Sequence, residues 1–364
     1  MTDAMELAVV GAGHIGTVHL QSAHAMDGVT VTGVADPKDA NRDRAERLTG
    51  CRTYEEYERL FAVENVDIAV IAVPPFLHLD AATAAVEAGC HLFVEKPLGR
   101  TTAEAEAIVE RADRAGVSLG VDHTVRYHPE IRELKTKYDA GELGHVPLAT
   151  IRRINDGPFD SPPAGDAEIA SGWHVNPTAT GGGALMDLGV HLFDTLRWFF
   201  GDLTVEHAEL DRQLDLPYED TATVVATNGD GTTAVLNCGF FQWERPPDVN
   251  MDFRLDGITD TLHSDSFVPD RFMTYAARTA AENVVKRSVG ADPEYFGPSY
   301  YYRAHHDALT AFCQAVRRGE DPPVDGTDGL RAVELVRSAY EMADDADWFD
   351  DVDDATRPLR SGPR

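Results

Sequence analysis

Between residues 5 and 121, short apolar runs alternate with longer helical segments, and this alternation constrains the fold more than any other feature. Segments such as HLDAATAAVEAG and TTAEAEAIVERADRAG have helical periodicity, the latter with Thr102 as the expected cap. Strands separated by helices form right-handed βαβ units, which build a parallel sheet covered on both faces. The predicted strands lie in MELAVVGAG, which runs into a turn, and in VTVTGVADP, VDIAVIAVPP, HLFVEKP and VSLGVDH.

The second half of the chain has a different pattern. After a helix near 129–138, several runs read as strands joined by turns such as NGDG, which predicts an antiparallel sheet: VPLATIRRI, VEHAELDRQL, TATVVATN, TAVLNCGFF and NMDFRLDG. Two helices follow, near 305–318 and 329–342. The predicted fold class is α/β: an N-terminal Rossmann domain with a parallel sheet (1–123), then a C-terminal α+β domain with a large, mostly antiparallel open sheet (124–345). Residues 346–364 are expected to form an acidic C-terminal tail.

The charge of the chain excludes some partners. There are 62 acidic against 32 basic residues, a formal charge of −30, and only five of the basic residues are lysines. We expect no nucleic-acid or membrane partner. The surface is typical of a halophile's cytoplasmic protein, although an acidic protein from a low-salt organism remains an alternative. The sequence has no signal-peptide or spanning pattern and its four cysteines are widely spaced, so we expect reduced thiols and a cytoplasmic location.

The stretch GAGHIG, residues 11–16, lies between the first expected strand and helix. There Gly11 permits the turn, Gly13 lets the backbone approach a pyrophosphate, and Gly16 allows close packing, while His14 and Ile15 open the helix. Asp36 ends the next strand, where its carboxylate can accept hydrogen bonds from an adenosine ribose. The expected cofactor is therefore NAD. Lys38 and Arg42 could reach a 2′-phosphate, which keeps NADP possible.

Two further motifs carry candidate chemistry. Glu95, Lys96 and Pro97 follow a central strand, and ligands bind at the carboxyl ends of such strands. GGGALMDLGVHLFD, residues 181–194, runs from three glycines into a helix that presents Asp187 and His191 one turn apart. The glycines would let the backbone pass close to a nicotinamide or substrate.

The order of these motifs resembles the glucose–fructose oxidoreductase / inositol dehydrogenase / rhizopine-catabolism (Gfo/Idh/MocA) family over nearly the whole chain. The resemblance implies an open sheet that serves as substrate platform and oligomer interface, hence a homo-oligomer, dimer or tetramer. It also implies that Lys96, Asp187 and His191 line the active site and that the Lys96–Pro97 bond is cis. VPPFLH, residues 73–78, matches a family segment in which Pro74 and His78 approach the cofactor, but Pro75 stands where an asparagine is usual.

Alcohol oxidation requires that a base remove the hydroxyl proton as hydride leaves carbon. We expect His191 to be that base, Asp187 to hold a substrate hydroxyl or orient the imidazole, and Lys96 to polarise the reacting oxygen. Further candidate substrate contacts are weaker: Arg126 beside Tyr127, the variable positions His123 and Thr124, His174, Tyr300 to Tyr302, and the pair His305 and His306. No HExxH or comparable spacing predicts a metal site.

The leading hypothesis is an NAD(P)-dependent dehydrogenase that oxidises a secondary alcohol of a cyclic polyol or sugar, of the inositol or aldose type. One alternative is an NAD-dependent glycosidase that oxidises the ring transiently and produces no net NADH. Another is a dinucleotide-binding regulator without catalysis, against which the presence of Lys96, Asp187 and His191 counts.

Overall fold

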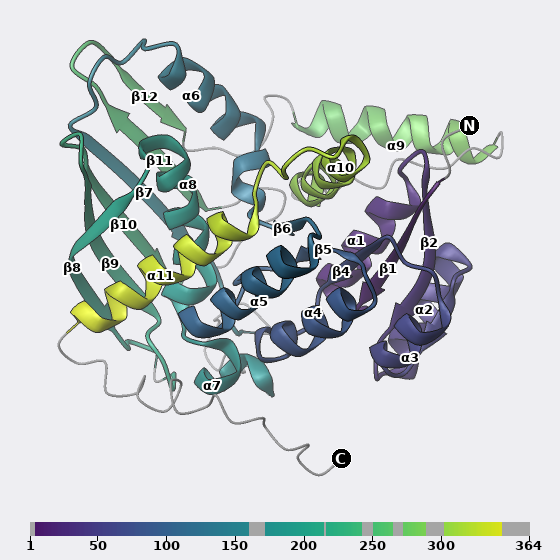
Figure 1. Cartoon of the computed structure of the whole chain (residues 1–364). Helices are drawn as coiled ribbons and strands as arrows, with labels where there is room; N and C mark the ends of the chain where they lie inside the picture. The colour runs from purple at the N-terminus through teal and green to yellow at the C-terminus, as the bar shows by residue number, and fades with distance from the viewer. Residues whose placement is uncertain are drawn as a thin grey trace.

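The computed structural model describes residues 4–159, 172–214, 216–241, 250–264, 272–288 and 302–343. Two six-stranded sheets organise the chain, one from each half of the sequence, with helices packed on and between them (Figure 1). The predicted fold class is confirmed. The expected acidic tail and two of the candidate substrate contacts, Tyr300 and Tyr301, lie outside the described residues.

The first sheet is parallel throughout and has the strand order β3-β2-β1-β4-β5-β6. Its strands β1, β4, β5 and β6 are nearly all buried because helices cover both faces. The direction of winding reverses between β1 and β4, and a crevice at such a reversal is where dinucleotides bind. The strands are β1 (Met5–Val10), β2 (Val29–Ala35), β3 (Arg52–Tyr54), β4 (Ile68–Ile71), β5 (His91–Val94) and β6 (Leu119–Val121).

The helices of this half agree with the sequence patterns except in two places. The short β3 and α3 were not predicted, because three- and seven-residue elements carry little periodicity. The cap of α5 is Thr101, whose side chain accepts a hydrogen bond from the Glu104 amide, so the expectation of Thr102 was wrong by one residue. The helices are α1 (His14–His24), α2 (Asp39–Thr49), α3 (Tyr57–Val63), α4 (His78–Glu87) and α5 (Thr102–Ala115).

The second sheet has the order β12-β11-β7-β10-β9-β8, with one parallel pair, β7 with β10, in an otherwise antiparallel arrangement. Of its strands, only the four-residue β12 was not predicted. The strands are β7 (Leu148–Ile154), β8 (Leu203–Asp211), β9 (Thr221–Asn228), β10 (Thr233–Gly239), β11 (Met251–Asp256) and β12 (Thr261–Ser264).

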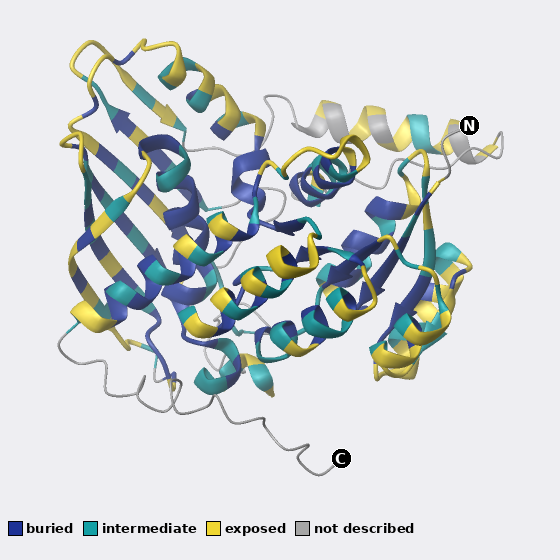
Figure 2. Cartoon of the chain, in the orientation of Figure 1, coloured by how far each residue is buried: buried dark blue, intermediate teal, exposed yellow. Residues whose placement is uncertain are grey.

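Helices cover only one face of this second sheet. α8 (Val190–Phe200) and α11 (Gly326–Met342) pack on it, and buried residues alternate with exposed or half-buried ones along β9 and β10 (Figure 2). The buried side chains join the second core through Phe193, Phe253 and Tyr340. Within the described residues, no helix covers the other face (Figure 1).

The late helices connect the two halves. α11 runs from β8 to α5, and α10 (Arg303–Arg318) packs beside α1 (Figure 1). Leu309 and Phe312 of α10 belong to the hydrophobic core of the first sheet. The proposed division at residue 123 thus separates the two sheets, while α10 returns to the first. α6 (Pro129–Asp139) agrees with the prediction; α9 (Phe272–Ser288) was not predicted. Among the described helices, none is both long and apolar enough to cross a membrane.

Candidate active site

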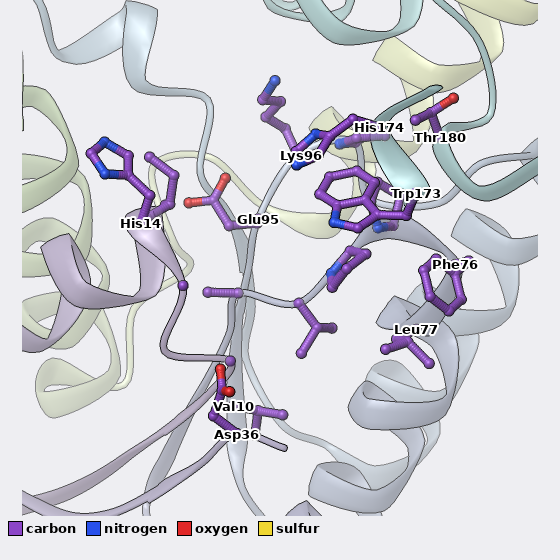
Figure 3. A pocket seen from close by; sticks show the side chains of 18 of the residues that line it. Val10, His14, Asp36, Phe76, Leu77, Glu95, Lys96, Trp173, His174 and Thr180 are labelled. Carbon is purple, nitrogen blue, oxygen red and sulfur yellow. The ribbon is translucent and has the colours of Figure 1, made fainter. Parts of the chain in front are cut away.

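A cavity of about 1140 Å³ lies at the carboxyl ends of the first sheet's strands and extends to the second sheet. Figure 3 shows Asp36 and Lys96 at opposite ends, with His14 and Glu95 between them. The volume exceeds the roughly 300–1000 Å³ of ordinary small-molecule pockets, so it can hold a dinucleotide together with a second small ligand. Of the ten predicted cofactor contacts, eight line this cavity: Gly11, Gly13, His14, Ile15, Asp36, Pro74, Glu95 and Lys96.

The glycine-rich turn has the geometry that a dinucleotide requires. Gly16 lies against the turn itself, and a Cβ added there would be 1.9 Å from the Gly11 carbonyl oxygen. Gly13 lines the cavity, and a Cβ there would have no atom within 4 Å. No side chain caps the first turn of α1, so its N–H groups are available to a phosphate. The residues present therefore fit NAD.

The Gly13→Ala variant tests this assignment. Because the added methyl group meets no protein atom, we expect the thermal unfolding of the cofactor-free chain to change little. The same methyl group would occupy space that the pyrophosphate needs, so NAD should bind at least about tenfold more weakly. Calorimetric titration with NAD measures the affinity, and Gly16→Ala, which forces a backbone clash, is the destabilised comparison. Tight NAD binding by Gly13→Ala would place the cofactor elsewhere.

Asp36 is 6% exposed and already accepts several hydrogen bonds. Its carboxylate accepts from the amides of Ala12 and Lys38, both at 2.8 Å, and from the Asn41 side chain at 3.1 Å. Of the two cations that could favour NADP, Arg42 donates to the Asp36 carbonyl oxygen at 2.6 Å, whereas Lys38 lines the cavity. Lys38 is thus the better placed of the two to meet a 2′-phosphate.

Lys96 and Asp187 bring the two halves of the chain together inside the cavity. The Lys96–Pro97 peptide bond is cis, as the family resemblance implied, and it follows β5 directly. Lys96 Nζ donates to the Asp187 carbonyl oxygen at 3.0 Å and forms an ion pair with the Asp187 carboxylate. The ammonium lowers the pKa of Asp187 although partial desolvation opposes this. Both side chains line the cavity, so a charged pair faces its contents.

His78 and Glu95 flank Lys96 in sequence or space and make contacts of different kinds: His78 contacts the Pro97 carbonyl oxygen, and Glu95 contacts His19. The His78 ring is 1% exposed and lies 2.9 Å from the carbonyl oxygens of both Pro97 and Val73. It therefore holds the cis segment against the loop after β4, and it is not among the residues that line the cavity. Glu95 lines the cavity and contacts His19 at 2.7 Å.

The helix that carries Asp187 and His191 is not regular. A π-helical turn (Leu185–Gly189) precedes α8, so the expected simple one-turn spacing is altered. Asp187 lies on the cavity wall with 45% of its side chain exposed, whereas His191 is 5% exposed and is not among the lining residues. Asp187 therefore faces the cavity, whereas His191 lies buried behind the cavity wall.

His191 packs against a second buried histidine. Its ring meets that of His123 edge to face with centroids 5.6 Å apart. Among the described residues, neither Nδ1 of His191 nor either ring nitrogen of His123 has a hydrogen-bond partner. Burial, reinforced by the positive charges of Lys96 and Arg153, lowers the pKa of His191 well below its ordinary value. The imidazole is therefore neutral at neutral pH.

The three glycines before this helix are required by protein contacts. A Cβ at Gly183 would be 2.0 Å from the Glu219 carbonyl oxygen, and one at Gly182 would be 2.2 Å from the Tyr340 hydroxyl. The buried Glu219 carboxylate accepts from the amides of Gly183 and Leu185 and from Tyr340. The expectation that the glycines make room for substrate was incomplete, since backbone beside Gly183 and the Tyr340 side chain beside Gly182 already fill that space. Glu219 was not predicted, because nothing in the local sequence marks its burial.

Arg126 was predicted to contact substrate, and the structure places it elsewhere. It is buried, forms two hydrogen bonds with Asp194 at 2.5 and 2.7 Å, and reaches Asp328 at 3.1 Å. These carboxylates hold its pKa above the usual range even though burial opposes this. Arg126 therefore ties α8 and α11 to the end of the first sheet, and we leave it out of the proposed substrate contacts.

Some of the remaining predicted substrate contacts line the cavity, and others are buried outside it. His174 lines the cavity and stacks on Trp173 at 3.8 Å, and both lie near Lys96 in Figure 3. Tyr302 contacts the His14 ring at 2.5 Å. His123 and His305 are buried outside the cavity lining. Trp173, Met186, Tyr218 and Phe240 also line the cavity and were not predicted, because apolar and aromatic residues there look like core residues in sequence.

Comparison with known proteins agrees with this geometry. Residues 5–123 match the model of an oxidoreductase family with an NAD-binding Rossmann fold (GFO/IDH/MocA), and residues 131–259 match the GFO/IDH/MocA C-terminal domain. The chain belongs to the GFO/IDH/MocA family. As a member, it is an NAD-binding oxidoreductase.

Three relatives show the range of this family. The chain is 34% identical over 195 residues to the rhizopine catabolism protein MocA of Rhizobium meliloti, which covers 54% of this chain and 57% of that protein. It is 26% identical to a D-xylose 1-dehydrogenase (NADP⁺) of Haloferax volcanii, over 93% of this chain and 98% of the relative. Among solved structures, scyllo-inositol dehydrogenase from Lactobacillus casei with NAD(H) and scyllo-inositol superposes with a TM-score of 0.73 at 16% identity, covering 94% and 97% of the two chains. This last likeness concerns the fold.

Proposed function

We propose that the protein oxidises a secondary alcohol of a cyclic polyol or sugar and passes the hydride to NAD. One observation carries the proposal: the Lys96–Asp187 pair faces the same cavity that the glycine-rich turn enters from its other end. Curated relatives named as inositol, apiose and xylose dehydrogenases support the substrate class.

Lys96 and Asp187 have complementary roles in this proposal. The bound NAD supplies the hydride acceptor. Lys96 donates a hydrogen bond to the reacting oxygen and stabilises the negative charge that develops as its proton leaves. Asp187 accepts a hydrogen bond from a neighbouring hydroxyl and holds the ammonium in place. His174, on the same wall, contacts a further ring hydroxyl.

His191 remains the proposed general base. A neutral imidazole has a lone pair that can accept the hydroxyl proton, and burial beside Lys96 keeps it neutral. The same surroundings make its protonated form unstable, so the proton must leave it rapidly. A substrate that reaches His191 passes the Asp187 carboxylate first, because Asp187 lies nearer the cavity.

Lys96→Met should raise the pKa of His191. Removing the ammonium removes the largest electrostatic cause of the lowered pKa, while burial remains. Titration of the His191 ring proton by NMR, in the unaltered chain and in the variant, measures the change. An unchanged pKa of His191 would mean that the two side chains do not interact.

Reduced-cofactor absorbance with a panel of cyclic polyols and aldoses tests the proposed function. The panel is offered with NAD and with NADP in molar KCl, and we expect formation of NADH with at least one ring alcohol. A chromogenic glycoside in the same panel detects the glycosidase alternative, which predicts release of the aglycone without net NADH. If NAD binds but no alcohol is oxidised, the proposed function is wrong.

We also propose a setting for this activity. The charge of −30 suits a cytoplasm of high salt concentration, where ions screen the repulsion among surface carboxylates. The face of the second sheet that carries Val225 and Val235 among threonines suits a homo-oligomer, since exposed apolar groups on a sheet face are costly in water. Sedimentation of the chain as a monomer in molar salt would contradict the second proposal.

A further inference from the structure

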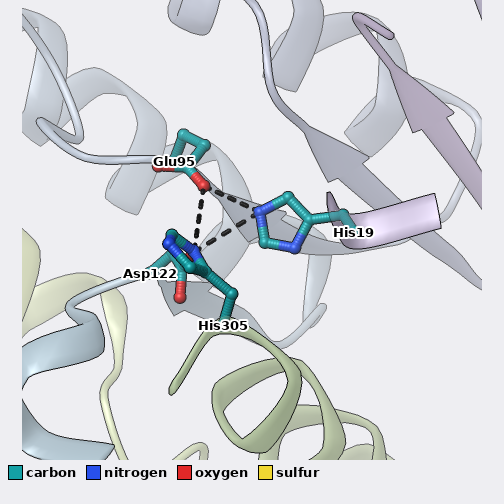
Figure 4. A group of neighbouring side chains, drawn as sticks. All are labelled: His19, Glu95, Asp122 and His305. Atoms are coloured by element: carbon teal, nitrogen blue, oxygen red, sulfur yellow. Dashed lines mark hydrogen bonds and ion pairs between the residues drawn. The ribbon is translucent and has the colours of Figure 1, made fainter. Parts of the chain in front are cut away.

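Four buried side chains meet behind the cofactor cavity, outside the proposed catalytic group. His19 comes from α1, Glu95 follows β5, Asp122 follows β6, and His305 belongs to α10 (Figure 4). One donor atom from each lies within 4.8 Å of the other three. We propose that this group binds a divalent transition-metal ion, with Zn²⁺ the best match.

The donor set suits such an ion. Two imidazole nitrogens and two carboxylate oxygens form a four-coordinate set of the kind that Zn²⁺ accepts. Nitrogen and oxygen ligands at 2.0–2.2 Å from a tetrahedral ion lie about 3.3 Å apart. His19 Nε2 lies 3.4 Å from Asp122 Oδ2, and His305 Nδ1 lies 4.0 Å from Glu95 Oε1. The first distance is close to the expected value, and the second is longer than it.

The two other distances are those of hydrogen bonds. His19 Nε2 lies 2.7 Å from Glu95 Oε1, and His305 Nδ1 lies 2.6 Å from Asp122 Oδ2. An ion that replaces the N–H proton in each pair needs these distances to increase by about 0.6 Å. The ligands are side chains on four separate elements, so small rotations provide this change.

A divalent cation would balance the two carboxylates of this group. Glu95 and Asp122 are two carboxylates in a space where the side chains are at most 12% exposed. Within the described part of the chain, no lysine or arginine forms an ion pair with either, and Asp122 Oδ1 has no hydrogen-bond partner. A divalent ion neutralises both carboxylates while leaving both imidazoles neutral.

The bound ion would have a structural role. It would join α1 and α10 to the ends of β5 and β6, and it would fix Glu95 immediately before Lys96. The candidate ligands are 76, 27 and 183 positions apart in the sequence, so no motif could reveal them.

Metal content decides the question without any assay of turnover. The full chain is incubated with Zn²⁺, freed of loose metal by gel filtration, and measured by elemental mass spectrometry. We expect about one Zn²⁺ per chain for the unaltered protein and for the His306→Gln control, which changes the next residue of α10. His305→Gln and Asp122→Asn should bind at least about tenfold more weakly. Equal zinc content in all four proteins, or none in the unaltered chain, would overturn the proposal.

A second measurement applies if the variants do not fold. Co²⁺ bound to the unaltered chain should give the intense visible absorption of a four-coordinate ion with nitrogen and oxygen ligands, without the thiolate charge-transfer bands that cysteine produces. Weak absorption typical of six-coordinate Co²⁺ would overturn the proposal. Since neither readout requires substrate or NAD, the metal proposal and the proposed function can fail independently.

Discussion

Lys96→Met is expected to lower the turnover number by at least about 100-fold while NAD affinity stays within a few-fold of that of the unaltered chain. Methionine keeps most of the side-chain volume but removes the ammonium that would stabilise charge on the reacting oxygen. The glycine-rich turn and Asp36, which hold the far end of the cofactor, are not altered. Steady-state kinetics on the best substrate of the panel, with NAD titration in parallel, measure both quantities.

The matched control for this experiment is Lys137→Met. Lys137 pairs with Glu133 on the exposed side of α6, so its loss should leave turnover unchanged. If Lys96→Met keeps full turnover, the cavity end that Lys96 marks is not the reaction centre. If it loses NAD binding instead, Lys96 acts on the cofactor and the proposed role in stabilising charge on the substrate oxygen is wrong.

Arg126→Met is expected to lower the free energy of unfolding by about 3–5 kcal/mol, because it leaves the buried Asp194 carboxylate without its cation. Asp194 is fully buried and accepts both hydrogen bonds of the guanidinium fork, and Asp328 loses one partner. Urea denaturation in fixed salt measures the loss. Arg152→Met, on an exposed position of β7, is the control and should change stability little.

The same variant separates two interpretations of Arg126. If Arg126 is a positioning residue, the Arg126→Met variant should be less stable, while the folded fraction should keep a nearly unchanged Michaelis constant for substrate. If Arg126 contacts substrate, the Arg126→Met variant should have a higher Michaelis constant and an almost unchanged stability. The second result would restore the interpretation made from sequence.

Much of the fold could be predicted because its signals are local and repeated. Strand and helix periodicity alternates from β1 to β6, and the glycine-rich turn lies where that alternation demands it. β3, α3, β12 and α9 were missed for different reasons: the first three are short, and α9 has no strong apolar face. Thr101 and Thr102 are adjacent threonines, so only the backbone could decide which one caps α5.

The candidate site could be predicted where its residues belong to motifs and not where they meet through the fold. Lys96 and Asp187 are 91 positions apart, yet each lies in a recognisable motif, so both were found. The sequence LMDLG does not reveal the π-helical turn, after which Asp187 faces the cavity while His191 is buried. Arg126 and His78 were predicted to contact ligands because their sequence motifs lie near the ligands in the family. In the structure, both side chains form hydrogen bonds with protein groups.

Transfer of deuterium tests the central claim most directly. The unaltered chain is given NAD and the best ring alcohol of the panel, deuterated at its carbinol carbons, and the product cofactor is examined by NMR. Deuterium is expected at C4 of the nicotinamide, and Lys96→Met should form this product at least about 100-fold more slowly. Reduced cofactor without deuterium, or the same rate in the variant, would contradict it.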